Sequence, residues 1–335
     1  MLLTTLALAL AGCGQSSAAG NTLRLGYFPN LTHAAALVGV ERGTFQQSLG
    51  ANVKVKSVIF NAGPAEITAL FADQIDIGYI GQNPAITGYV QSHGQALRII
   101  AGAASGGAFF VVRPGANIHT PADLSGKILA DPQLGGTQDV ALRHYLQQHD
   151  LQTADKGGTV QMVPTDNATI LTEFKQGKID GAWAPEPWAT RLIDEAGGQV
   201  FVNERALWPD GKFVTTDVIV NTKFLNAHPD LVKKFLQAHV DTVKYILSNP
   251  DAAQTLVNHA LKSLTVKPLT AEEMSQAWAN FAVTYDPLAS TLQESADREY
   301  ALGFLGTNKP DLSSINSLGT LNEVLRDEGL ATVSD

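Results

Sequence analysis

Residues 70–86 read LFADQIDIGYIGQNPAI, and the organisation of the chain can be worked out from this segment. Apolar residues at 67, 70 and 71 share one face of a helix that Pro64 can begin, so a helix is predicted over 64–73. Residues 75–79 alternate between apolar and small or polar, which predicts a strand. Gly-Gln-Asn-Pro at 81–84 then suits the start of a new helix. A helix N-terminus beyond a strand end has free N–H groups and a partial positive charge, so it suits an anion.

A similar unit recurs about a hundred residues later. Residues 174–187 read FKQGKIDGAWAPEP and again give a helix end, a glycine break, a strand and a proline-containing loop. Two copies of one unit indicate two similar lobes. The alternative is that any α/β domain contains helix-then-strand units joined by Gly/Pro loops.

Composition indicates a folded globular protein that does not bind nucleic acid. The 335 residues are 44% hydrophobic, which is enough for a large core and for two lobes. The net charge is −9 and no run of cations is visible, whereas phosphate binding depends on clustered Lys and Arg. Any anion site must therefore use oriented dipoles more than overall charge.

Residues 1–20 differ from the rest of the chain. Residues 2–11 are almost wholly apolar but too short to span a bilayer, as in a signal peptide. Leu-Ala-Gly-Cys at 10–13 resembles the lipobox of bacterial lipoproteins, so lipidation of Cys13 is expected, with residues 14–20 as a tether. The alternatives are a chance cysteine in an ordinary signal peptide, or a start codon placed too far downstream, because no Lys or Arg precedes the apolar run. Cys13 is the only cysteine, so no internal disulfide is possible.

From residue 23 onward, predicted strands and helices alternate. Such alternation implies mainly parallel sheets covered by helices on both faces, with ligands beyond the carboxyl ends of the strands. The predicted strands are 23–27, 53–60, 75–79, 97–103, 109–114, 127–131, 160–163, 179–183, 200–202 and 214–220. After residue 229 the pattern becomes helical, and this tail is expected to pack on the first lobe. Its predicted helices are 231–247, 252–261, 271–281, 292–304 and 315–325.

Several segments, in order, resemble one family. They are LGYFPNLTHAAALV at 25–38, ERGTF at 41–45, QIDIG at 74–78, TPADLSGK at 120–127, GGT at 135–137 and WAPEPW at 183–188. Together they resemble the nitrate/sulfonate/taurine family of periplasmic substrate-binding proteins of ABC importers. The resemblance covers about residues 23–224, and the helical tail fits in kind only.

The resemblance implies a fold, a location and partners. The fold would be the α/β two-lobed periplasmic-binding-protein fold (type II), with lobe 1 formed by residues 21–111 and 217–335 and lobe 2 by residues 112–216. Hinged lobes would clamp a small anionic solute, and the membrane permease and ATPase subunits would be the partners. The protein would be an extracytoplasmic, lipid-anchored monomer without a cofactor.

Loop residues in both lobes are candidate ligand contacts. Backbone N–H groups and amide side chains at helix starts can hold an anion, and Gly-Gly-Thr adds close backbone approach and a hydroxyl donor. The candidates in the first lobe are Pro29, Asn30, His33, Gly81, Gln82, Asn83 and Ala85. The candidates in the second lobe are Gly135, Gly136, Thr137, Gln138, Glu186, Thr215 and Thr216.

Each group of candidates also has a plainer explanation. Asn83 and Thr32 can serve only as helix caps, and Gly-Gly-Thr can be an ordinary turn. His33, in a first helical turn, can simply be exposed. Glu186 would repel a sulfonate, so it would face an amine or hydroxyl of the ligand, or accept hydrogen bonds from donors that close the lobes.

Four aromatic residues are candidates for the apolar wall of the cleft: Phe28, Trp183, Trp188 and Trp208. Trp183 and Trp188 can equally well be core residues, because large aromatics usually supply packing area. Two such side chains in the cleft would favour an organic ligand over nitrate.

An enzyme is the main alternative, since similar two-lobed folds carry catalysis in porphobilinogen deaminases and in pyrimidine or menaquinone biosynthesis. The folded part has no cysteine for a covalent cofactor, and the histidines show no H-E-x-x-H spacing, so neither a metal nor an enzymatic function is expected. A sensor or adhesion module that lost transport is a further alternative. Among ligands, an alkanesulfonate or taurine comes first, then nitrate or bicarbonate, then a pyrimidine or flavin precursor.

Overall fold

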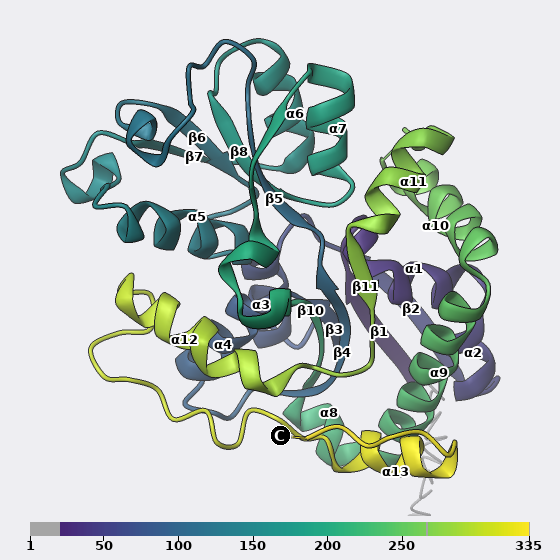
Figure 1. The fold of residues 1–335 in the computed structure, drawn as a ribbon. Helices are drawn as coiled ribbons and strands as arrows, with labels where there is room; N and C mark the ends of the chain where they lie inside the picture. Colours follow the sequence, from purple (N-terminus) through teal and green to yellow (C-terminus); the bar gives the residue numbers. More distant parts are fainter. Residues whose placement is uncertain (1–20, 266, 335) are drawn as a thin grey trace, which may run out of the picture.

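Two β-sheets covered by helices form two lobes (Figure 1) in this computed structural model, which describes residues 21–265 and 267–334. Cys13 and the expected signal and tether lie outside the described residues. Within the described ranges, no helix is long and apolar enough to cross a membrane. We call the part built on the first sheet lobe 1 and the part built on the second sheet lobe 2.

The sheet of lobe 1 is mixed. Its strands lie in the order β11-β4-β10-β3-β1-β2. Strand β1 pairs in parallel with β2 and β3, whereas β10 is antiparallel to both β3 and β4, so β1 to β4 share one direction. The expected parallel arrangement is therefore confirmed for β1 to β4, and the returning strands run against it. The bounds are β1 (Asn21–Tyr27), β2 (Val53–Ile59), β3 (Ile77–Ile80), β4 (Leu97–Gly106), β10 (Val214–Asn221) and β11 (Phe281–Val283).

The sheet of lobe 2 follows the same plan, in the order β7-β6-β8-β5-β9. Strand β6 is parallel to β7 and β8, and β5 runs antiparallel to β8 and β9. Both sheets thus point the carboxyl ends of three neighbouring strands toward the other lobe (Figure 1). The bounds are β5 (Ala108–Val112), β6 (Ile128–Asp131), β7 (Gln161–Pro164), β8 (Gly181–Pro185) and β9 (Gln199–Asn203).

Helices cover both faces of each sheet and bury separate apolar cores. On lobe 1 one face carries α1 (Ala34–Glu41), α2 (Thr44–Leu49), α9 (Pro229–Ser248), α10 (Pro250–Thr265) and α13 (Gly319–Asp327). The other face carries α3 (Gly63–Phe71), α4 (Gln82–Gln91) and α12 (Leu292–Ala301). On lobe 2, α5 (Thr137–Gln148) covers one face, and α6 (Asn167–Lys175) and α7 (Trp188–Ala196) cover the other. The units α3-β3-α4 and α6-β8-α7 confirm the repeat seen in the sequence.

A buried carboxyl group sets the position of α3 on its sheet. Gly26 and Gly78 are partners on β1 and β3, and a Cβ at either residue would lie 2.2 Å from Glu66 Oε1. Two side-chain-free positions therefore leave the space that Glu66 of α3 fills. Burial raises the pKa of Glu66 well above its usual value and so favours the neutral carboxyl.

The chain crosses between the lobes at two adjacent places. Gly106 and Gly107 join β4 to β5 with φ of 79° and 77°, a left-handed conformation that favours glycine. The returning strand β10 lies beside them, where Thr215 Oγ1 donates to the carbonyl oxygen of Gly106. Arg205 Nη2 of lobe 2 donates to the carbonyl oxygen of Ser105 at 2.9 Å, which fastens lobe 2 to the first crossing.

The tail packs on lobe 1 as expected, and α9 and α10 contact α1. It also reaches lobe 2, because α11 contacts α7 and α12 contacts α5. The helix predicted over 271–281 is too long: it ends at Ala279, and β11 then pairs with β4. The remaining helical elements are α8 (Thr222–Ala227), α11 (Ala271–Ala279), η1 (Leu31–His33), η2 (Pro121–Leu124), η3 (Ala154–Lys156), η4 (Glu204–Leu207), η5 (Pro209–Gly211) and η6 (Ala289–Thr291).

Candidate functional site

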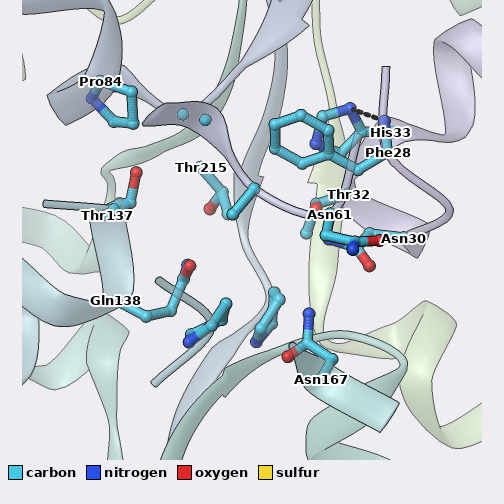
Figure 2. Close-up of a pocket in the computed structure, with 16 residues that line it drawn as sticks. Phe28, Asn30, Thr32, His33, Asn61, Pro84, Thr137, Gln138, Asn167 and Thr215 are labelled. Carbon is cyan, nitrogen blue, oxygen red and sulfur yellow. Dashed lines mark hydrogen bonds between the residues drawn. The ribbon is translucent and has the colours of Figure 1, made fainter. Parts of the chain in front are cut away.

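A cavity lies between the lobes where the loops that follow the parallel strands meet (Figure 2). Its volume is about 30 Å³. Since one water needs about 10–15 Å³ on this measure, the cavity holds roughly two or three waters or one small polar group. It is lined by Phe28, Asn30, Thr32, His33, Asn61, Ala62, Gly63, Gly81, Pro84, Pro132, Gly136, Thr137, Gln138, Asn167, Pro185 and Thr215.

Four α-helices begin at this cavity, two from each lobe. Gly63 of α3 and Pro84 in the first turn of α4 line it from lobe 1. Thr137 of α5 and Asn167 of α6, each the first residue of its helix, line it from lobe 2. The first N–H groups of a helix have no partner within the helix and carry partial positive charge. The arrangement therefore suits an anion or another acceptor-rich solute.

No Lys, Arg, Asp or Glu is among the described residues that line the cavity. The remaining titratable group, His33, is neutral, because burial lowers its pKa to about 3. Its Nδ1 accepts the backbone N–H of Phe28 at 3.3 Å, which assigns the ring proton to Nε2 (Figure 2). The walls thus offer neutral donors rather than a counter-charge.

Two buried side chains at the cavity have polar atoms without a protein partner. These atoms are Thr137 Oγ1 and Asn167 Oδ1. Both residues are more than nine-tenths buried, with 9% and 7% of their surface exposed. An unpaired buried polar atom costs free energy, so each of them favours a bound solute that supplies the missing hydrogen bond. The O and N atoms of an Asn amide are interchangeable by a flip, so Asn167 can present its N–H group instead.

Charged side chains behind the cavity wall hold the glycine loop that precedes α5. Asp139 Oδ2 accepts the N–H of Gly135 at 2.8 Å, and Asp139 Oδ1 accepts from Arg143 Nε at 2.7 Å. Burial raises the pKa of Asp131, and the neighbouring carboxyl of Asp139 raises it further. The hydrogen bond from Gly135 to Asp139, itself held by Arg143, therefore anchors the loop on the side of α5.

The structure brings many of the residues expected from the sequence to this cavity and keeps others away from it. The lining includes Asn30, His33, Gly81, Gly136, Thr137, Gln138 and Thr215. The described lining does not include Pro29, Gln82, Asn83, Ala85, Gly135, Glu186 or Thr216. One interpretation of the sequence had His33 exposed. It is instead buried, with only 2% of its surface accessible.

Side-chain direction explains most of these differences. Neighbouring strand residues point to opposite faces, so Thr215 reaches the cavity and Thr216 does not. On α4, Gln82 and Asn83 turn toward α12: Gln82 Oε1 accepts from Ser295 Oγ at 2.6 Å, and Asn83 Nδ2 donates to Glu299 Oε2 at 3.3 Å. Ala85 is part of the core.

The capping roles considered for Asn83 and Thr32 are wrong. The residue that caps α4 is Gly81, and Asn83 lies inside the helix. Thr32 lies within η1, where no side-chain cap bond is formed, and it lines the cavity instead. Helix α4 therefore begins at Gln82, directly after Gly81, and Asn83 is a residue of its first turn rather than its cap.

Sequence reasoning missed Asn61 and Asn167 as cavity residues. Asn61 follows the predicted strand 53–60 directly, and Asn167 follows the predicted strand 160–163 after a three-residue loop. The rule that ligands lie beyond the carboxyl ends of parallel strands was sufficient to find them. Of the four aromatic candidates, only Phe28 lines the cavity. Trp183 is fully buried against Phe110, with ring centroids 5.5 Å apart, so it is a core residue.

Hydrogen bonds from lobe 1 to the loop around Glu186 hold the lobes together beside the cavity. The N–H of Leu31 donates to the carbonyl oxygen of Glu186 at 2.9 Å, and Asn280 Nδ2 donates to Glu186 Oε1 at 2.6 Å. Trp188 Nε1 donates to Asn30 Oδ1 at 3.0 Å. Burial raises the pKa of Glu186 to about 7. Of the two roles expected for Glu186, the geometry fits the acceptor for donors that close the lobes.

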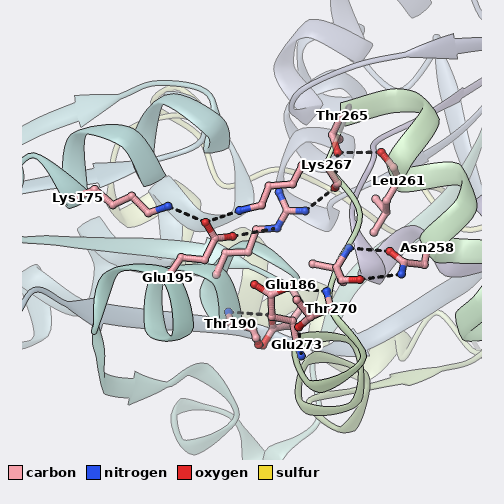
Figure 3. Close-up of polar contacts among 12 residues, drawn as sticks. Lys175, Glu186, Thr190, Glu195, Asn258, Leu261, Thr265, Lys267, Thr270 and Glu273 are labelled. Carbon is pink, nitrogen blue, oxygen red and sulfur yellow. Dashed lines mark hydrogen bonds and ion pairs between the residues drawn. The ribbon is translucent and has the colours of Figure 1, made fainter.

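An ion-pair cluster extends this contact outward (Figure 3). Glu195 of α7 pairs with Lys267 of the tail, Nζ to Oε2 being 2.5 Å, and with Lys175 of its own lobe at 2.6 Å. Arg191 Nη2 donates to the carbonyl oxygen of Lys267 at 2.7 Å. We call the contacts of Glu186 and Glu195 with lobe 1 and the tail the closing seam. Among the described residues, no group of three His, Cys, Asp or Glu is placed to hold a metal ion.

By sequence, the chain matches one family and a curated binding protein. A sequence model described as the NMT1-like family matches residues 17–261. The taurine-binding periplasmic protein of Escherichia coli (strain K12) is 28% identical over 220 residues, which are 64% of this chain and 64% of that protein. The chain thus spans under two thirds of the length of this relative.

Two solved structures share the fold. The alkanesulfonate-binding protein SsuA from Xanthomonas axonopodis pv. citri, bound to MOPS, superposes with a TM-score of 0.70 at 19% identity, over 85% of this chain and 94% of that one. The periplasmic nitrate-binding protein NrtA from Synechocystis PCC 6803 superposes with a TM-score of 0.72 at 14% identity, over 92% of this chain and 89% of that one. The resemblance stated from the sequence motifs is confirmed.

Proposed function

The chain belongs to the NMT1-like family, and from this premise we propose that it is the solute-binding component of an ABC importer. The solute is a small organic anion of the alkanesulfonate or taurine type. It binds between the lobes and holds them closed, and closure is what the permease and ATPase subunits in the membrane detect.

One observation carries the proposal: four helix N-termini converge on a cavity without charged side chains. Oriented N–H groups and the hydroxyl of Thr137 would replace the hydration of a singly charged oxyanion. A cationic solute would meet the positive ends of all four helices and find no carboxylate. The name of the taurine-binding relative agrees with this chemistry.

Nitrate or bicarbonate is the second candidate. The cavity volume of about 30 Å³ favours it, because an inorganic oxyanion needs less space than a complete organic solute. The aromatic argument for an organic ligand does not apply, since Phe28 is the one expected aromatic in the described lining.

A calorimetric panel with the purified protein tests the choice. It contains taurine, methanesulfonate, nitrate and bicarbonate, with choline as a cation of similar size. We expect the sulfonates to bind and to raise the melting temperature, since a ligand at 100 times its Kd adds about 2.7 kcal/mol to native stability. If nitrate binds and the sulfonates do not, the second candidate replaces the first. If no anion shifts the melting temperature, the proposal fails.

Anchoring and assembly are separate parts of the proposal. Lipidation of Cys13 would keep the binding protein at the outer face of the membrane, near its permease, and raise the effective concentration there. Detergent-phase partitioning of the expressed full chain tests this: the natural chain should enter the detergent phase, and Cys13→Ser should stay in the aqueous phase. Sedimentation should show a monomer, and recovery of unchanged solute after prolonged incubation would oppose an enzymatic role.

A further inference from the structure

A second, larger cavity adjoins the first at the mouth of the cleft. Its volume is about 420 Å³, and Asn61 and Pro132 line both cavities. Asn61 follows β2 of lobe 1 and Pro132 follows β6 of lobe 2, so each lobe contributes one residue shared by the two cavities. We call the larger cavity the outer chamber.

Both lobes contribute apolar side chains to the outer chamber, beside the polar Asn61, Gln133 and Thr165. Lobe 1 contributes Ile59, Phe60 and Ala65, and lobe 2 contributes Pro132 and Pro164. Ile59 is 39% exposed although it is a large hydrophobic residue at the end of a strand. An apolar tail that covers Ile59 and Phe60 would remove such surface from water and gain affinity in proportion to the area buried.

One carboxylate faces the outer chamber. Asp166 lines it and caps α6, with Oδ1 accepting the N–H of Thr169 at 3.0 Å and Oδ2 accepting its hydroxyl at 2.7 Å. Burial opposes ionisation, but these hydrogen bonds hold the pKa of Asp166 below its usual value. The carboxylate is therefore charged at neutral pH and repels a second anionic group placed in the chamber.

We propose that the outer chamber is a subsite for the aliphatic tail of an alkanesulfonate solute and that Asp166 rejects tails ending in a second anion. This inference rests on the proposed function, because it assumes an anionic head in the inner cavity. The head occupies the small cavity of about 30 Å³, and the tail leaves it between Asn61 and Pro132. The subsite therefore makes the protein selective for singly charged organic anions over both inorganic oxyanions and dianions.

Calorimetry with n-alkanesulfonates from methanesulfonate to hexanesulfonate tests the tail subsite. Each buried methylene is expected to tighten binding by roughly two- to fourfold. Ala65→Trp fills the chamber from an exposed helix position and should abolish the gain with length while leaving methanesulfonate affinity unchanged. Ile59→Ser should reduce the gain. If methanesulfonate binds and longer chains bind no tighter, the subsite is wrong and the proposed function stands. If no sulfonate binds but nitrate does, the subsite is wrong and the second candidate replaces the first. If no anion binds, both the subsite and the proposed function fail.

A second titration tests the role of Asp166. Ethane-1,2-disulfonate should bind the natural protein at least tenfold more weakly than ethanesulfonate. Asp166→Asn keeps an oxygen that can cap α6 and should bring the two affinities together. Glu173→Gln is the matched control, since it removes one charge from the same helix outside the chamber lining and should leave the ratio unchanged. An Asp166→Asn protein with the natural ratio would overturn the assignment of Asp166.

Discussion

Gly81 of lobe 1 and Thr137 of lobe 2 lie so close that a Cβ at residue 81 would be 2.1 Å from Thr137 Oγ1. Each residue stands at the start of a helix whose N-terminus faces the cavity. The contact is possible only with glycine at 81 and with the lobes together. A side chain at residue 81 would therefore prevent the lobes from approaching as closely as they do here.

Gly81→Ala should hold the lobes apart. The added methyl must displace Thr137, and overpacking of this kind costs about 1–3 kcal/mol in the closed state, or roughly 5- to 150-fold in Kd. Small-angle scattering with and without ligand should show a smaller change in radius of gyration than in the natural protein. Gly319→Ala is the control, because nothing lies within 4 Å of its Cβ position. Unchanged affinity in Gly81→Ala would show that the contact does not govern closure.

Thr137→Ala and Asn83→Ala should have opposite consequences. Thr137 has an unpartnered hydroxyl at the cavity, so its loss should weaken ligand binding by about 1–3 kcal/mol with little change in urea stability. Asn83 donates to buried Glu299 on α12, so its loss should lower the free energy of unfolding by about 1–2 kcal/mol and affect binding less. The expectation is contradicted if the two variants lose affinity equally.

His33 should stay neutral throughout the physiological range. Burial lowers its pKa to about 3, below the ordinary 6.5, so folding favours the neutral ring, and this contribution is lost as pH falls from 6.5 toward 3. In ¹⁵N-labelled protein the His33 ring, assigned by its disappearance in His33→Gln, should show the Nε2–H tautomer from pH 8 to pH 5. A titration near pH 6 would mean that the cavity offers a cation.

Glu299→Gln should remove a pH-dependent loss of stability. Burial raises the pKa of Glu299 from 4.5 to about 8, so its contribution to stability is complete below pH 4.5 and is lost as pH rises toward 8. The melting temperature of Glu299→Gln should exceed that of the natural protein by a margin that grows from pH 5 to pH 8 and is level above. A margin that is constant with pH would indicate that Glu299 does not titrate in this range.

Of the two side chains that donate to Glu186, Asn280 should contribute more to closure of the lobes than Thr190. Both donate to the carboxyl group of Glu186, but Asn280 does so from the tail and Thr190 from the same lobe. At pH 8.5, above the pKa of about 7, Glu186 is ionised, and a hydrogen bond to a charged group contributes about 1.5–3 kcal/mol, so Asn280→Ala should weaken ligand affinity roughly 10- to 150-fold. Thr190→Val removes a donor from the same carboxyl and should lower stability instead. Equal losses of affinity would place the effect in Glu186 itself rather than in closure.

Local patterns in the sequence were sufficient for the order of strands and helices, for the repeated helix-strand-helix unit and for the helix starts that carry the site. These features depend on residues close together in the chain: the period of apolar residues, glycine and proline breaks, and caps. The same local rules placed Gly136, Thr137 and Gln138 at the cavity, because a glycine turn before a helix beyond a strand end can be read directly.

Contacts between distant residues decided the rest. Asn83 turns to Glu299, more than two hundred residues away, and Phe281 leaves its helix because β4 offers an unpaired edge. Gly81 is restricted by Thr137, which no local pattern reveals. Side chains near a helix start point into a cleft or toward a neighbouring helix according to where the tail packs, and packing free energy between segments far apart in sequence settles that choice.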